Sequence, residues 1–260
     1  MALTSFDAYI ARAAAIGNDV QPIYGQIQSA TSTSLLAAST SVWQRVAYTR
    51  AVPNPLPSGV TAYNPVMLSL TSSVTSAFTC VKQVNLGTIT FGNSTATFSA
   101  GSSMPTVTQG NTASVQTSGM MMAEVTTALS ATPGSITVNY NNQAGSAKST
   151  ASTAITASAV VGTCSPWILA AGDWGVQSVT SITPSGVGAS QSGVITLWGL
   201  LPIGSGTSVG SAVAGTSGVR NFLTSSLPPA HLVAGDQIGI FTAISTARAV
   251  QGTLTYVGAS

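Results

Sequence analysis

Residues 84–99 read VNLGTITFGNSTATFS, and this stretch decides the fold class. Val84–Phe91 and Ser94–Ser99 contain the β-branched and aromatic residues that favour strands. Gly92-Asn93 lies between them and is a two-residue turn signal typical of a β-hairpin. The stretch therefore predicts two antiparallel strands joined by a tight turn.

The same pattern of short strands and tight turns continues along the chain. Ile136, Val138 and Tyr140 alternate with polar residues and are expected on one face of a strand. Further strands are expected at Met120–Leu129, Ser135–Tyr140, Ser149–Ile155, Val176–Ile182, Val194–Leu201, Asp236–Ile244 and Ala249–Val257. The chain is predicted to be mainly β, with an antiparallel β-sandwich or jelly-roll-like body, and periodicity does not choose between these topologies.

A short helix is expected before this body. Phe6, Ile10, Ala13 and Ala14 recur at helical spacing, and Gly17-Asn18 is a typical helix end. A helix this short is unstable alone, so its apolar face is expected to dock, on its own sheet or on a neighbouring subunit.

Four prolines between residues 53 and 65 predict an extended, irregular connection. We therefore expect an N-terminal helix and extended arm over residues 1–65 and a β body over residues 66–260. A division of that body into two β subdomains near residue 160 is an open alternative.

Charge is almost absent from this sequence. Charged residues make up 5% of the chain, against about 25% in typical soluble proteins. The mean hydropathy of +0.40 is high, but a membrane helix needs about 20 consecutive apolar residues. The densest apolar run, Ile195–Ile203, is interrupted by Thr196, Gly199 and Pro202. No membrane partner is expected.

Export and direct nucleic-acid binding are not expected either. Asp7 and Arg12 interrupt the segment where a signal peptide needs a continuous apolar core. Nucleic-acid binding draws on clustered basic residues, and Arg45 and Arg50 are the nearest approach to a cluster.

The residues that usually carry chemistry are few and scattered. Asp and Glu number five, and His231 is the one histidine. Metal sites need several carboxylate, histidine or cysteine ligands at suitable spacing, so neither a metal nor another cofactor is expected. His231 and Asp236 leave a serine hydrolase as an alternative, but no GxSxG motif accompanies them. We expect that the protein is not an enzyme.

The chain contains two cysteines. Cys80 and Cys164 are far apart and are expected to be buried thiols, with a disulfide left open.

Glu124 lies in a strand-like stretch, on the same face as Met122 and Thr126. We expect it on a solvent-facing edge or paired with Lys or Arg; the alternative is an anchor for a subunit contact.

Large aromatic residues carry the remaining information about function. Trp167, Trp174 and Trp198 lie near turns or strands, and such residues either fill a core or anchor an interface. The candidate interface residues are Phe6, Ile10, Trp43, Trp174 and Trp198.

The glycine-rich runs at 204–206 and 210–218 are expected to form a flexible loop between strands.

Several segments resemble a group of tailed-bacteriophage virion proteins, and they occur in the same order. They are Leu3–Ile10, Trp43 with Arg50–Pro55, Thr126–Gly134 running into Ile136–Tyr140, Asn142–Gly145, Leu169–Ser178 and Leu227–Leu232. The resemblance covers most of the chain except the insert at 204–218, and it includes no diagnostic motif. It implies a location in the virion and carries over no catalytic residue.

Together these observations predict a structural component of a phage particle, assembled in the host cytoplasm. The expected role is a capsid decoration or cement protein that binds the major capsid protein or other virion proteins and forms a homo-oligomer. The alternative is a tail, baseplate or fibre component that recognises a host surface glycan.

Overall fold

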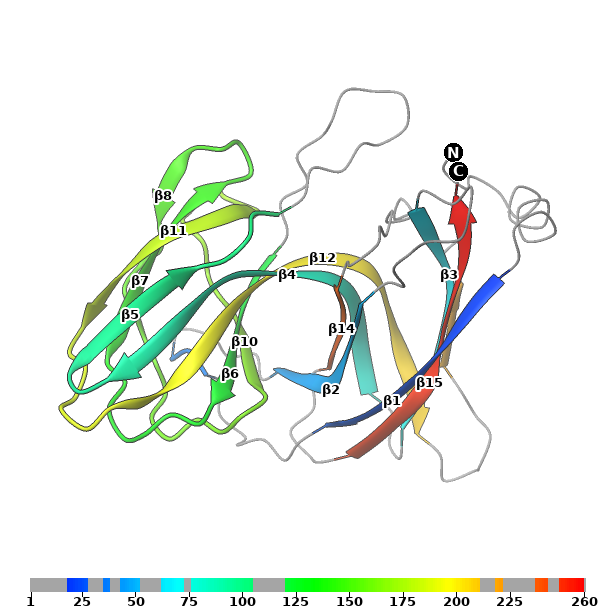
Figure 1. The fold of residues 1–260 in the computed structure, drawn as a ribbon, viewed down its shortest axis with the longest axis horizontal. Helices are drawn as coiled ribbons and strands as arrows, with labels where there is room; N and C mark the ends of the chain where they lie inside the picture. Colours follow the sequence, from blue (N-terminus) through cyan, green and yellow to red (C-terminus); the bar gives the residue numbers. More distant parts are fainter. Residues whose placement is uncertain are drawn as a thin grey trace.

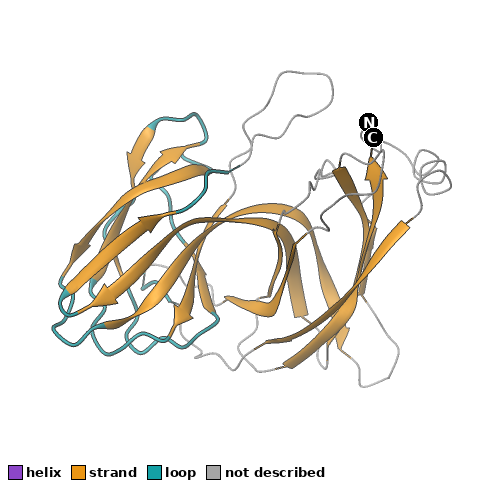
Figure 2. Ribbon diagram, in the orientation of Figure 1, coloured by secondary structure: helices purple, strands orange, loops and turns teal. Residues whose placement is uncertain are grey.

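The computed structural model describes residues 18–27, 35–37, 43–51, 62–72, 76–104, 120–210, 218–221, 237–242 and 248–259. Within them the chain forms strands and loops (Figure 2). None of these residues belongs to a helix long and apolar enough to cross a membrane. The helix predicted around Phe6 and Ile10 lies outside the described residues.

Fifteen strands occur in the described part of the chain. They are β1 (Asn18–Ile27), β2 (Trp43–Ala51), β3 (Ala62–Ser72), β4 (Ser76–Gly92), β5 (Thr95–Ala100), β6 (Met120–Thr127), β7 (Ser135–Asn142), β8 (Ala147–Ser149), β9 (Thr153–Ala154), β10 (Thr163–Pro166), β11 (Val176–Ser185), β12 (Ser192–Gly210), β13 (Gly218–Asn221), β14 (Gln237–Thr242) and β15 (Arg248–Ala259).

These strands form two sheets (Figure 1). The larger sheet has 11 strands in the order β1-β15-β3-β12-β6-β10-β2-β14-β4-β5, with β13 beside β3, and the smaller has four, β11-β7-β8 with β9 beside β7. The short β12–β3 ladder is parallel, and the other ladders in the described residues are antiparallel. The predicted mainly β, antiparallel, sandwich-like fold is confirmed.

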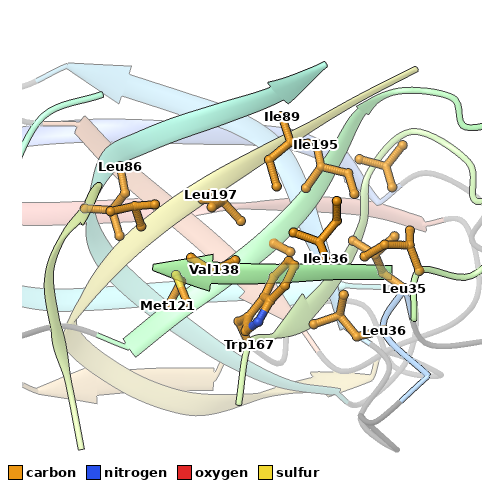
Figure 3. Packing of buried hydrophobic residues seen from close by; sticks show 14 of the residues in the cluster. Leu35, Leu36, Leu86, Ile89, Met121, Ile136, Val138, Trp167, Ile195 and Leu197 are labelled. Carbon is orange, nitrogen blue, oxygen red and sulfur yellow. The ribbon is translucent and has the colours of Figure 1, made fainter. Parts of the chain in front are cut away.

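The main hydrophobic core lies between the two sheets (Figure 3). Ile136 and Val138 of β7 face it from the smaller sheet, and Ile89, Ile195 and Leu197 face it from β4 and β12; all five have no exposed surface. The side chains of β7 alternate between buried and partly buried along the whole strand. This is the period-2 pattern predicted from Ile136, Val138 and Tyr140.

A second apolar cluster covers the opposite face of the larger sheet. It contains Val81, Met122, Cys164, Leu200 and Phe241, with Trp43 and Trp198 packed against it. Strand β6 is therefore buried on both faces, since Met121, Ala123 and Val125 belong to the main core. Cys164 carries a buried thiol, as predicted.

The hairpin predicted from residues 84–99 joins β4 to β5. Its turn lies one residue later than expected, on Asn93 and Ser94, which have φ angles of 43° and 67°. Two positive φ values are the signature of a type I′ turn, whose twist matches the right-handed twist of paired strands.

Strands β4 and β12 pair along almost their whole length, from Gly92 opposite Ser192 to Ser76 opposite Ser208. Figure 1 shows the two strands continuing together from the sandwich into the other half of the molecule. The prediction of a flexible loop at Gly204–Gly206 was wrong, because these residues continue β12 opposite Cys80, Thr79 and Phe78. Ladder hydrogen bonds with β4 override the weak strand preference of glycine. Residues 211–217 lie outside the described part.

Strand pairing connects segments on both sides of residues 65 and 160, the limits considered for the predicted domains. Strands β1 and β2 lie inside the segment 1–65 and pair with β15, β10 and β14. Strands from either side of residue 160 pair in both sheets, β6 with β12 and β7 with β11. Both sheets therefore cross the division considered near that residue.

Gly87 in β4 provides a test of the hairpin packing. Its φ is +153°, and a Cβ at this position would meet the ring of Phe98 from β5. We expect Gly87→Ala to lower the free energy of unfolding by about 1–3 kcal/mol, because the added methyl group overpacks the site. Urea unfolding followed by circular dichroism measures this change.

Gly92→Ala is the matched control. A Cβ at Gly92 has nothing within 4 Å, so this variant should stay within about 0.5 kcal/mol of the native protein. Equal effects of the two substitutions would contradict the packing of Phe98 over Gly87.

Candidate interface loop

The structure separates the five predicted interface residues. Phe6 and Ile10 lie outside the described residues. Trp43 and Trp198 are partly buried against the second apolar cluster, whereas Trp174 is 66% exposed. Trp174 lies in residues 167–175, the connection from β10 to β11, which we call the Trp174 loop.

The Trp174 loop begins at a buried anchor. Trp167 is 3% exposed and belongs to the main core, as expected for a core-filling tryptophan. Its backbone N–H donates to Met121 O at 2.9 Å, and its indole N–H lies 3.4 Å from Thr150 Oγ1. These contacts fix the point where the loop leaves the larger sheet.

A tight turn shapes the second half of the loop. The N–H of Asp173 donates to Ala170 O at 3.0 Å, and Gly172 has a φ of +86°. A positive φ at the third residue of a turn is characteristic of type II and favours glycine. Leu169–Asp173 therefore contains a tight turn shortly before β11.

The carboxylate of Asp173 ties this turn to β7. Tyr140 OH donates to Oδ2 at 2.6 Å, and Asn142 Nδ2 donates to Oδ1 at 2.8 Å. The Tyr140 hydroxyl oxygen in turn accepts from the N–H of Ala170 at 2.9 Å. The loop is therefore held at both ends of its turn by one strand of the smaller sheet.

This arrangement shifts two pKa values. Burial, followed by the hydrogen bond to Asp173, raises the pKa of Tyr140 to about 12, so its hydroxyl remains a donor at neutral pH. The hydrogen bond from Tyr140, then that from Asn142, lowers the pKa of Asp173; the charge of Lys148 contributes less. Asp173 is therefore ionised, and its charge is satisfied by neutral donors.

The β7–β8 hairpin supports the far side of the loop. Gln143 Oε1 accepts from the backbone N–H groups of Trp174 and Gly175 at 3.3 Å, and Gln143 O accepts from Gln177 Nε2 at 3.0 Å. Asn142 Oδ1 accepts from the N–H groups of Ala144 and Ser146 at 3.0 Å. One amide side chain, that of Asn142, thus braces both the hairpin and the loop.

The hydrogen-bonded Trp174 loop exposes two apolar side chains to solvent. Ile168 is 55% exposed and Trp174 is 66% exposed. Among the residues whose exposure the structure describes, these are the two most exposed large hydrophobic side chains, ahead of Met120 at 39% and Val161 at 38%. An exposed tryptophan on a fixed backbone is suited to anchoring a contact, because little loop entropy is lost on binding.

Few charges occur in this part of the chain, and the two that are not buried lie at the Trp174 loop. Residues 76–104 and 120–210 contain four charged side chains, those of Lys82, Glu124, Lys148 and Asp173. Lys82 and Glu124 are 5% and 3% exposed. The remaining polar surface of this part consists of Ser, Thr, Asn and Gln.

The prediction of a solvent-facing Glu124 was wrong. This residue is buried, and the indole N–H of Trp198 donates to its Oε2 at 2.6 Å. The face was predicted correctly, since Met122 lies on the same side of β6, but the second apolar cluster covers that face. Pairing of Glu124 with Lys or Arg stays a prediction, and a carboxylate buried in its own chain is unsuited to anchor a subunit contact.

The described residues also bear on metal binding. Within them, no three His, Cys, Asp or Glu side chains come together as a metal site would require. His231 and Asp236, the pair considered for a hydrolase, lie outside the described residues.

The hydrogen-bond network of the Trp174 loop was not predicted from the sequence. Tyr140 was expected on the same strand face as Ile136 and Val138, and no link between Tyr140 and Asp173 was predicted. The signal that links them is weak: a tyrosine on a buried face needs a partner for its hydroxyl, and few acidic residues are present to provide one.

Acid unfolding tests the network. The pKa of Asp173 is below its ordinary value of 3.8 in the folded protein. The stabilisation from its carboxylate is therefore fully present above pH 3.8 and is lost as the pH falls through the folded pKa. We expect Asp173→Asn and Tyr140→Phe to weaken the dependence of unfolding free energy on pH in this range, measured by urea titrations at several pH values.

Lys148→Gln serves as the control, because the Lys148 charge is a minor cause of the shift. It should leave the acid dependence close to that of the native protein. An Asp173→Asn variant with native acid dependence would show that the network does not lower the Asp173 pKa.

Comparison with known proteins identifies no family. No family model matches the chain, and no curated protein matches it. Weakly similar solved structures include that of the infectious bursal disease virus Gx strain, with 10% identity, 93% of this chain and 81% of that chain covered, and a TM-score of 0.17. Another is the VP2 subviral particle of the same virus, with 8% identity, the same coverage and a TM-score of 0.15. TM-scores this low carry no argument about the fold or the function.

Proposed function

We propose that this protein is a non-catalytic structural component of a virus particle, and more specifically a capsid decoration protein of a tailed bacteriophage. In this role it binds the major capsid protein or a neighbouring virion protein. The observation that carries the proposal is the Trp174 loop: Ile168 and Trp174 are exposed on a backbone held by hydrogen bonds. The resemblance of the sequence to phage virion proteins supports the particle location.

The proposed contact depends on shape and hydrogen bonding rather than on ion pairs. The sandwich offers two apolar anchors, with the neutral side chain of Gln143 bonded to the loop. Of its four charges, the two that are not buried are those of Lys148 and Asp173, which have opposite signs and lie near each other at the loop. Interface cores are depleted in charged residues and enriched in aromatic ones. A surface of this kind fits a neutral, hydrogen-bonding partner surface such as that between shell subunits.

Recognition of a host glycan is the second candidate. Trp174 is the observation that favours it, because an exposed indole ring can stack on a sugar and the polar side chain of Gln143 lies beside the loop. In that case the protein would belong to the tail or a fibre. Immunogold labelling of intact particles distinguishes the tail from the capsid.

Removal of the anchor tests the proposed contact. We expect Trp174→Ala to weaken binding to particles that lack this protein by at least about tenfold, because central tryptophans contribute strongly to interfaces. Co-sedimentation of labelled protein with such particles measures the affinity. Val161→Ala is the matched control, since Val161 is also an exposed apolar side chain but lies outside the Trp174 loop.

Native affinity in the Trp174→Ala variant would exclude the loop as the particle contact. Loss of binding to a host glycan, with binding to particles retained, would favour the second candidate.

The scarcity of charge predicts weak dependence on salt. Screening acts mainly on exposed charges, so we expect the affinity for particles to change by less than about threefold between low and high salt. The same co-sedimentation assay over a series of sodium chloride concentrations measures it. A steep loss of binding with salt would contradict the proposed contact through neutral surfaces.

A further inference from the structure

Six strands of the larger sheet close into a ring. Strand β4 pairs with β12 and β14, β12 pairs with β6, β6 with β10, β10 with β2, and β2 with β14. The second apolar cluster takes side chains from all six strands, on the face opposite the main core. Because a cluster that receives side chains from every strand of a closed ring lies inside it, the ring has a packed interior.

A glutamine lies in this interior with both ends of its amide group unpaired. Gln83 of β4 is 2% exposed, and its register opposite Leu200 places it on the inner face of the ring with Val81. Neither Oε1 nor Nε2 of Gln83 has a hydrogen-bond partner in the described part of the chain. Both atoms are bonded to water in the unfolded chain, so burying them without a partner costs folding free energy. Buried polar side chains are therefore almost always bonded to protein or to ordered water.

Gln191 shows how the same protein satisfies an equally buried glutamine. It too is 2% exposed. Its Oε1 accepts from the N–H of Thr132 at 2.9 Å and from Ser130 Oγ at 3.0 Å, and its Nε2 donates to Ser192 O at 3.0 Å. The two glutamines thus have the same exposure but opposite hydrogen bonding, and the difference marks the surroundings of Gln83 as unusual.

Strand β14 provides the neighbours of the Gln83 amide. A Cβ at Gly239 would meet Gln83 Oε1, so the amide occupies space that the glycine leaves open. Gln237 is partly buried and lies directly opposite Gln83 in the β4–β14 ladder. Directly opposite residues project from the same face with Cβ atoms about 4.5–5.5 Å apart. A second amide side chain is therefore close enough to share a small bridging molecule with Gln83.

We propose that ordered water is bound inside the ring, between the side-chain amides of Gln83 and Gln237. Oε1 of Gln83 needs a donor and Nε2 needs an acceptor, and water is the smallest neutral molecule that provides both. An ion would need an opposite charge, which two amides do not supply. Buried waters make about three hydrogen bonds to polar groups that are otherwise unpaired. The inference concerns the interior of the ring and does not depend on the proposed function.

A high-resolution crystal structure of the full chain tests the proposal directly. We expect a water oxygen within about 2.7–3.2 Å of Oε1 or Nε2 of Gln83. Nuclear magnetic resonance adds a measurement in solution: the side-chain NH₂ of Gln83 should show cross-relaxation with bound water. The NH₂ of Gln191 is the matched control within the same molecule, because its bonding is provided by the chain, and it should show no such signal.

Gln83→Met supplies the matching variant, since methionine has a similar length but no amide. We expect this variant, with its fold verified by circular dichroism, to lose the bound water. The crystal and resonance measurements on the native protein decide the question even if the variant does not fold. A dry Gln83 amide would overturn the proposal, as would an amide bonded to another side chain of the chain or to a molecule other than water. Equal water signals at Gln83 and Gln191 would overturn it as well.

Discussion

Pairing between β4 and β12 is the interaction on which the rest of the structure depends. The two strands bond from Gly92 opposite Ser192 to Ser76 opposite Ser208, so one ladder runs through both halves of the molecule. At one end it provides Ile89, Ile195 and Leu197 to the sandwich core. At the other end β12 meets β3 and β4 meets β14. The β4–β12 ladder thus links the strands of both halves into one sheet, with β3, β5, β6 and β14 paired directly to it.

Hydrogen bonds from neutral donors satisfy the carboxylates of Asp173 and Glu124, where many other proteins use ion pairs. Asp173 is ionised but is satisfied by a tyrosine hydroxyl and an amide, and buried Glu124 accepts from an indole. Such contacts are directional and little affected by salt. They fix the Trp174 loop and the buried strand β6 without a close ion pair to Asp173 or Glu124 in these bonds.

The parts of the fold that depend on residues close together in the sequence could be predicted. The alternation in Ser135–Tyr140, the hairpin after Phe91 and the buried Cys164 follow from residues close together in sequence. Burial of Glu124 was not predictable, because it depends on an apolar cluster assembled from β4, β6, β10, β12 and β14. The Trp174 loop was partly predictable: its turn is local, but Tyr140 and Asn142 reach Asp173 from about thirty residues earlier.

The distance along the chain between paired strands has a consequence for how the protein is made. Partners in the β4–β12 ladder are about a hundred residues apart or more, and Asn18 of β1 pairs with Val257 of β15. Contacts this distant in sequence make folding slow, since a long loop must close before they form. During synthesis, β1 emerges from the ribosome more than two hundred residues before its partner β15. Strands with few charges are then exposed with little electrostatic repulsion to keep nascent chains apart, so the low charge that suits the finished surface leaves the unfinished chain most dependent on protection while it folds.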